Sequence, residues 1–268
     1  MDRIRKALDL ARIERQQQTH DAPRAHDSRA LAALPGPIVY TSTRVVAVSP
    51  EHLESQRVVP PGAPGPASAG LRMLRTQVLQ RMTAHHWRTL AIFSPSAREG
   101  RTTTAVNLAL HIANDQDHTV LLVDLDLRRP GVAAAFGFSP ERGVEDVLAG
   151  GTELRDCLYH PDGCERLVVL PARGPMPHPS EVLAGQRCHE LVAELRARYE
   201  GRIVIFDLPP VLTTDDALAF SRHVECGLLV AAEGRTRRSD LTRAIELLHQ
   251  TPIVGTLLNR ASGVATER

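Results

Sequence analysis

Three places in the chain carry residue types that could hold a phosphate group and a metal ion. The first is the stretch LAIFSPSAREGRTTTAVNLA at 90–109. Its apolar start predicts a buried strand, its Pro and Gly predict a turn, and apolar residues at helical spacing from Thr102 onward predict a helix. In such a unit, the free N–H groups of the loop and the positive end of the helix dipole face the same side. The stretch therefore predicts an anion site that suits phosphate.

The loop in this stretch matches a phosphate loop only in part. The full pattern is G-x-x-x-x-G-K-[ST], in which Lys contacts the phosphates and the hydroxyl holds magnesium. Gly100, Arg101 and Thr102 occupy the last three places, and Pro95 occupies the first. Arg101 keeps the positive charge but carries it on a planar fork, and the only lysine in the chain is Lys6. From the loop alone, a phosphate site and an ordinary turn stay equally open.

The other two places are acidic side chains that follow apolar runs. Asp124 and Asp126 come after the apolar run in TVLLVDLDLRRP, and Asp207 comes after the one in RIVIFDLPP. The carboxyl ends of neighbouring parallel strands meet at one edge of a sheet, where ligands bind. Carboxylates at that edge can hold Mg²⁺ beside a phosphate, although capping of a turn is the simpler role for each one alone. Three strands that deliver such groups to one edge favour a shared site.

Strands and helices alternate along the rest of the chain. Apolar runs predict further strands at 167–170, 228–232 and 253–258, and helical spacing predicts helices at 71–88, 180–199 and 239–250. Alternation of this kind predicts an α/β fold with a mainly parallel sheet flanked by helices. We expect this domain to span 71–268. Before it, we expect a short amphipathic helix at 1–18 and a proline-rich, mostly irregular linker at 19–70, with an edge strand or strap at 38–48.

Composition excludes several classes of protein. The net charge of +1 and the 3% of aromatic residues argue against a nucleic-acid partner. The four cysteines form no C-x-x-C pair, as is typical of reduced thiols in a cytosol. No apolar run approaches the roughly 20 residues that span a bilayer, and no signal peptide is evident. We therefore expect a cytoplasmic protein, with recruitment to the inner face of the membrane through a partner.

The motifs in 71–260 together resemble those of the bacterial tyrosine kinases of polysaccharide export. FSPSAREGRTT stands in place of S-P-x-x-G-E-G-K-[ST]-T, the family's Walker A loop, while LLVDLDLRRP and IVIFDLPPVL match its two acidic motifs. The family is the CpsD/CapB type, within the MinD/ParA-like deviant P-loop NTPases. ALDLA and YTSTRVV near the start resemble kinase-like proteins encoded with exopolysaccharide and exosortase systems.

The resemblance implies a three-layer P-loop NTPase fold and a site for ATP and Mg²⁺. Asp124 would accept the proton of a tyrosine hydroxyl, assisted by Asp126 and Arg101 as further catalytic groups. Metal-shell roles fall to Thr102, Asp126 and Asp207. The residues that would contact ATP are Gly100, Arg101, Thr102, Thr103 and, at the adenine, Asn259.

The chain departs from the family pattern at several positions. Arg98 stands where the loop has an inner Gly, a backbone strain if its φ is positive, and Arg101 replaces the Lys. Ala69 stands in place of the Glu of the E-x-x-R-x-x-R assembly motif, so a homo-oligomer is an open expectation. The family's tyrosine-rich tail is not matched, so autophosphorylation of such a tail is not expected.

Three functions follow from these features. The first is an ATP-dependent tyrosine-kinase-like regulator of exopolysaccharide synthesis or export, acting with a separate membrane chain-length determinant, or polysaccharide co-polymerase. The second is a weak or inactive pseudokinase that serves as a scaffold for that partner. A MinD/ParA-type ATPase is less favoured, because Ser96 occupies the place of that group's signature Lys.

Overall fold

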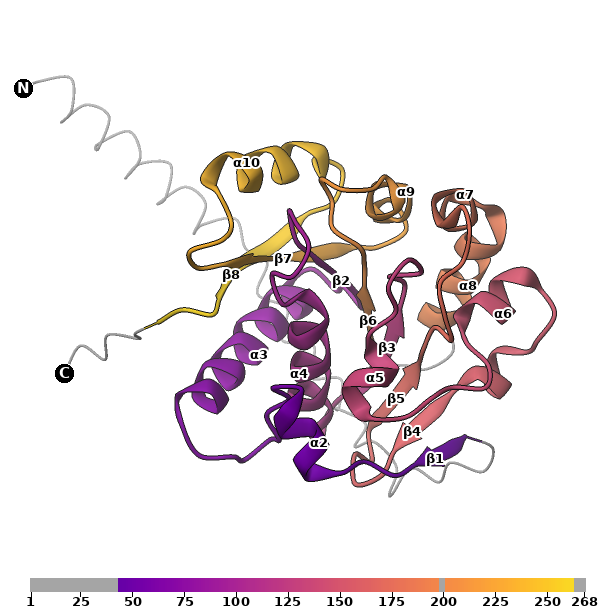
Figure 1. Cartoon of the computed structure of the whole chain (residues 1–268), viewed down its shortest axis with the longest axis horizontal. Coiled ribbons are helices and arrows are strands. Elements are labelled where there is room, and N and C mark those ends of the chain that lie inside the picture. Colours follow the sequence, from indigo (N-terminus) through magenta and orange to yellow (C-terminus); the bar gives the residue numbers. More distant parts are fainter. Residues whose placement is uncertain (1–42, 198–200, 263–268) are drawn as a thin grey trace, which may run out of the picture. The chain divides into compact units, whose positions relative to one another are not determined.

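The computed structural model describes residues 43–197 and 201–262, all within the unit that spans 35–268. Its centre is an eight-stranded sheet in the order β1-β4-β5-β3-β6-β2-β7-β8 (Figure 1). Only β4 and β5 pair antiparallel; the other neighbours are parallel. The strands are β1 (Arg44–Val46), β2 (Thr89–Phe93), β3 (Thr119–Asp124), β4 (Tyr159–Pro161), β5 (Leu167–Leu170), β6 (Arg202–Asp207), β7 (Cys226–Ala232) and β8 (Ile253–Asn259). The predicted mainly parallel α/β sheet is confirmed.

Helices cover both faces of this sheet and make three layers. One face packs against α2 (Pro50–Ser55), α3 (Pro66–Ala84), α4 (Arg101–Ala113) and α5 (Val132–Phe136). The other packs against α6 (Val144–Ala149), α7 (Pro179–Ala184), α8 (Gln186–Ala197), α9 (Asp216–Ser221) and α10 (Arg238–Leu247). Along β3, Val120 and Leu122 face the first core and Leu121 and Val123 face the second. Burial on both faces explains why the central strands read as continuous apolar runs.

The register of the central strands aligns their carboxyl ends. Asp124 at the end of β3 pairs with Asp207 at the end of β6, and Ile92 of β2 pairs with the same Asp207. The loop after β2 and the two acidic strand ends therefore emerge side by side, as the sequence predicted.

Some elements begin or end differently from the prediction. The predicted boundary at 71 falls inside α3, which begins at Pro66, because a proline at the first helical position gives up no hydrogen bond. The predicted helix at 180–199 is two helices, α7 and α8, with Gly185 between them. β1 lies in the stretch where an edge strand was expected and pairs with β4. The helix expected at 1–18 lies outside the described residues.

The segment before α3 is fixed to the domain by a buried amide. Asn107 of α4 accepts a hydrogen bond from the Val59 N–H at 2.7 Å and donates one to the Arg57 carbonyl at 3.1 Å. The ring nitrogen of His111, one turn along α4, lies 3.2 Å from the Val59 carbonyl. This end of the expected linker is therefore part of the folded domain.

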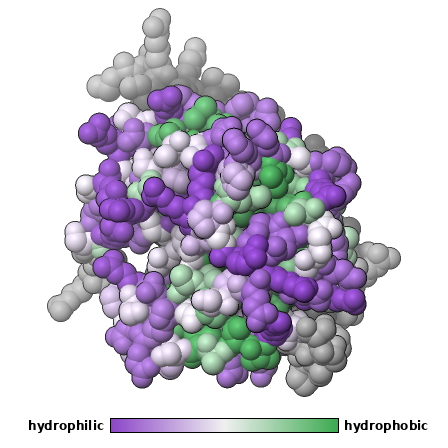
Figure 2. Space-filling view, turned by 45° about the vertical axis from the view of Figure 1, so that its right-hand side comes forward, coloured by the Kyte–Doolittle hydropathy of each residue, from purple (hydrophilic) through white to green (hydrophobic). Residues whose placement is uncertain are grey.

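No helix within the described ranges is both long enough and apolar enough to cross a bilayer. The face shown in Figure 2 is mostly hydrophilic, with smaller apolar areas between the polar side chains. Large apolar side chains that are exposed occur at Val45, Met73, Ile245, Leu247 and Leu258.

Gly227 of β7 tests how tightly the sheet packs. A Cβ atom there would overlap the ring of the fully buried Phe93. We expect Gly227→Ala to lower the free energy of unfolding by about 1 to 3 kcal/mol, the usual cost of overpacking a core. Urea unfolding measures it. Gly151→Ala is the control, because a Cβ at Gly151 meets nothing within 4 Å; equal stability of the two variants would contradict the packing described.

Candidate functional site

The loop between β2 and α4 holds two residues in the left-handed region. Gly100 has φ +91° and precedes the first residue of α4, and a Cβ there would overlap the side-chain amide of Asn259. Arg98 has φ +63°, a conformation that costs a residue with a side chain of the order of 1 kcal/mol or more. The strain anticipated from an arginine at this position is therefore present.

The start of α4 is left open to a ligand. Gly100 has no side chain, so the N-cap residue supplies no side-chain hydrogen bond to the N–H groups of the first turn. Thr102 and Thr103 lie half-buried in that turn. Thr102 also lies against Gly131, which begins the α5 segment. An uncapped helix start of this kind attracts anions through its N–H groups and its dipole.

A buried carboxylate holds the loop in this shape. Glu99 accepts hydrogen bonds from the Ser96 N–H at 2.8 Å and from the Thr236 hydroxyl at 2.5 Å. The side-chain amide of Asn259 donates to the Glu99 carbonyl at 3.0 Å. The predicted adenine contact of Asn259 stays a prediction; what the structure places beside it is the loop. The roles of Glu99 and Thr236 were not predicted from the sequence. The feature of the sequence that pointed to them was the position of an acidic residue, Glu99, inside a phosphate-type loop.

Arg101 brings the separate motifs together. Its side chain is only 8% exposed, and its Nη2 donates to Asp126 Oδ2 at 2.7 Å. Nη1 donates to the Ser94 hydroxyl at 2.9 Å, and Nε lies 3.6 Å from Asp207 Oδ1. One guanidinium thus contacts two of the three predicted acids and the first residue of the loop.

Asp207 is fully buried at the end of β6 and poorly satisfied. Neither of its carboxylate oxygens accepts a hydrogen bond of normal geometry within the described part of the chain. Burial raises the pKa of Asp207 to about 6, although Arg101 and the hydroxyl of Thr102 act in the opposite direction. A buried acceptor whose donors are imperfectly placed is a position that a further ligand could satisfy.

Asp124 is fully buried as well, but its oxygens are occupied. Oδ2 accepts from the N–H groups of Gly131 and Val132, both at 2.9 Å, and Oδ1 accepts from the Asp126 N–H at 3.2 Å. Burial, and then the charge of Asp207, raise its pKa above the usual range for a carboxyl. Asp124 fixes the turn from β3 to α5, and its role as a base stays a prediction.

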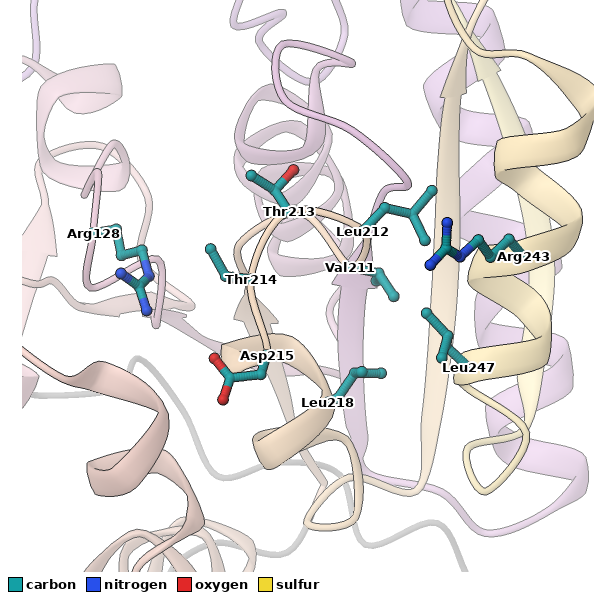
Figure 3. A pocket seen from close by; sticks show the side chains of 9 residues that line it. All are labelled: Arg128, Val211, Leu212, Thr213, Thr214, Asp215, Leu218, Arg243 and Leu247. Carbon is teal, nitrogen blue, oxygen red and sulfur yellow. The ribbon is translucent and has the colours of Figure 1, made fainter.

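A cleft of about 470 Å³ is lined by Arg128, two residues beyond Asp126, and by residues of the segment that follows β6 (Figure 3). Arg128 lies on one side of it and Arg243 and Leu247 of α10 lie on the other. Arg128 makes a bidentate ion pair with the buried Asp216, at 2.6 and 3.0 Å. The segment lining the cleft is bonded to the loop after β2, because the Leu212 N–H donates to the Pro95 carbonyl.

Several known proteins resemble this chain in both sequence and fold. No protein-family model matches the chain. Tyrosine-protein kinase YwqD of Bacillus subtilis (strain 168) is 31% identical over 191 residues, which cover 70% of this chain and 78% of YwqD. The chain belongs to the bacterial tyrosine-protein kinases. The crystal structure of the VpsO kinase domain has a TM-score of 0.66 at 33% identity, covering 73% of this chain and 96% of that domain.

The other proteins that this chain resembles differ in length. The chimerical protein CapA2B2 has a TM-score of 0.70 at 25% identity and is matched over 93% of its length. Tyrosine-protein kinase etk of Escherichia coli (strain K12) is 32% identical, but the chain spans only 26% of it. The cell division ATPase MinD of Pyrococcus furiosus has a TM-score of 0.57 at 25% identity, covering 65% of this chain and 73% of that chain. The family resemblance and the MinD-like P-loop NTPase fold inferred from the sequence are thus confirmed.

The buried Asp207 predicts a stability that depends on pH. Its raised pKa means that it favours folding below about pH 4 and that this contribution is lost as the pH rises through about 6. We expect Asp207→Asn to stabilise the protein at pH 7.5 by up to about 3 kcal/mol, and by much less at pH 4.5. Urea unfolding at both values measures the difference. Asp215 is exposed, so Asp215→Asn should change stability little at either pH. A gain in stability for Asp207→Asn that does not vary with pH would contradict the raised pKa of Asp207.

Proposed function

We propose that this chain is an ATP-dependent protein-tyrosine kinase of exopolysaccharide production. The observation that carries the proposal is the meeting of Arg101, Asp126 and Asp207 beside the uncapped start of α4. A helix start with a cation and carboxylates beside it has the parts that phosphoryl transfer needs, since catalysis there is mainly positioning and neutralisation of charge. The tyrosine-protein kinases YwqD and etk, each more than 30% identical, support the reaction type.

The phosphates of ATP would lie against the first turn of α4. The backbone N–H groups of Gly100, Thr102 and Thr103 would contact them, together with the guanidinium of Arg101. The unsatisfied oxygens of Asp207 and the hydroxyl of Thr102 suit Mg²⁺, which takes oxygen ligands. When bound with ATP, the ion would neutralise charge on the phosphates. Asp126 could join the metal's shell only after leaving Arg101.

Proton transfer from the tyrosine hydroxyl is better assigned to Asp126 than to Asp124. The hydrogen bonds of Asp124 within the described residues all come from backbone N–H groups, which makes it a positioning residue for the turn before α5. One oxygen of Asp126 accepts a hydrogen bond from the Arg129 N–H, and the other accepts one from Arg101. The oxygen that now contacts Arg101 would become free to accept a proton once the guanidinium moves to contact a phosphate group.

The proposed partner is a separate membrane chain-length determinant, or polysaccharide co-polymerase, that recruits this chain to the inner face of the membrane. The lengths of the relatives support it. The chain matches only 28% of tyrosine-protein kinase wzc of Salmonella typhi and 26% of etk, so most of each relative lies outside the matched region. A homo-oligomer is a further proposal.

Nucleotide binding is tested first by thermal unfolding with Mg-ATP. At 100 times the dissociation constant, ATP should stabilise the protein by about 2.7 kcal/mol, a rise in Tm of roughly 5 to 10 °C. Arg98→Gly combined with Arg101→Lys should bind about tenfold more tightly, a gain of about 1.4 kcal/mol, because the loop can then approach the phosphates closely. No rise in Tm at millimolar ATP would favour the pseudokinase scaffold instead.

Kinase activity is tested separately by transfer of labelled phosphate to tyrosine in a random Glu-Tyr copolymer. We expect incorporation with the native chain and a loss of at least a hundredfold in Asp126→Asn, because the proton acceptor is then absent. Asp117→Asn is the matched control and should keep its activity, since Asp117 is exposed and precedes β3, at the opposite end of that strand from Asp124. Binding of ATP without transfer would identify a nucleotide-binding scaffold.

A further inference from the structure

The guanidinium of Arg101 lies where a cation bound to the acidic cluster would lie. Its three nitrogens face three different oxygen-bearing side chains, those of Asp126, Ser94 and Asp207, at 2.7, 2.9 and 3.6 Å. By contrast, Arg142, in its ion pair with Asp156, has more than half of its side chain exposed. Arg101 is therefore an internal cation, surrounded by protein oxygens.

Electrostatics explains why a cation is needed at this position. Asp124 and Asp207 are fully buried and Asp126 nearly so, which brings three carboxyl groups into a region of low dielectric. Buried carboxylates are costly unless a positive charge compensates them. Arg101 is the side chain whose ion pairs supply that charge. A divalent ion that approached the same oxygens would meet the guanidinium at a few Å and be repelled.

A lysine could not fill this position in the same way. The planar fork of arginine donates in several fixed directions, so it can contact Ser94 and Asp126 at once while its Nε stays near Asp207. The ammonium of lysine is a compact point charge at the end of a flexible stem. The replacement of the loop's lysine by Arg101 thus favours contacts with the acids as well as with phosphate.

We propose that Arg101 is the resident cation of the nucleotide-free site, and that a divalent metal enters only together with a nucleotide. The phosphates offer the guanidinium an alternative partner, and its departure frees an oxygen of Asp126 and uncovers Asp207. Metal binding would then be ordered after nucleotide binding, or simultaneous with it. The entry of metal together with a nucleotide rests on the proposed function, whereas the role of Arg101 in the nucleotide-free site is independent of it.

The resident cation is tested with Mn²⁺ alone, followed by the loss of the electron paramagnetic resonance signal of the free ion. The native chain should show no site below about 1 mM. Arg101→Ala should gain a site at least tenfold tighter, and Arg101→Ala with Asp207→Asn should lose it again. Arg128→Ala is the matched control, because it frees Asp216 at the same edge without touching the cluster.

Two results would overturn the resident cation. The first is a dissociation constant for Mn²⁺ in the native chain that lies within threefold of the one in Arg101→Ala. The second is an Arg101→Ala variant that gains no Mn²⁺ site although its circular dichroism shows that it is folded. Arg101→Gln, which keeps the length and polarity of the side chain but not its charge, decides the matter in the same way if the alanine variant does not fold.

The ordered entry of metal is tested by adding ADP. Calorimetry first establishes whether ADP binds in the presence of a chelator. If it does, the native chain should then bind Mn²⁺ beyond the amount held by free ADP; its failure to do so would refute the ordered entry. If ADP binds neither with the chelator nor with Mn²⁺ present, the proposed function fails, whereas the result with Mn²⁺ alone still decides the role of Arg101.

Discussion

The structure depends on one electrostatic constraint: two neighbouring strands end in carboxyl groups that are both fully buried. The register of the sheet pairs Asp124 with Asp207, so neither can move away from the other without a shift of a whole strand. Such a shift would turn every side chain of that strand to the opposite core. The chain relieves the crowding in two ways. Backbone N–H groups satisfy Asp124, and Arg101 supplies charge beside Asp207.

The loop after β2 serves mainly to place that arginine. Glu99 ties the loop to Thr236 of the segment after β7, and Asn259 at the end of β8 donates to the loop's backbone. With Gly100 in the left-handed region, α4 then begins at Arg101 itself. The side chain of the first helical residue can therefore reach back under the loop to the ends of β3 and β6. Arg101, in the first turn of α4, therefore links the ends of two strands that are far apart in the sequence.

The sequence predicted the parts of this arrangement that depend on local pattern. Buried parallel strands are apolar on both faces, so β2, β3 and β6 could be recognised along with the acids that follow them. The partners of Glu99 and Arg101 could not be predicted. Thr236 is 137 residues away from Glu99, and the choice of Asp126 by Arg101 depends on side-chain torsions that no spacing encodes. The three N–H groups on Asp124 likewise follow from the shape of the turn and not from residue type.

The two departures of the loop from the family pattern differ in physical character. Arg98 affects the backbone: its side chain is exposed, and its cost lies in a positive φ that glycine would adopt freely. Arg101 affects charge: its side chain is buried and makes two hydrogen bonds and a further ion pair. A loop that had merely lost its ligand would leave the buried carboxylates without a cation. Arg101 instead places a positive charge beside Asp126 and Asp207, and any phosphate must compete with Asp126 for the guanidinium.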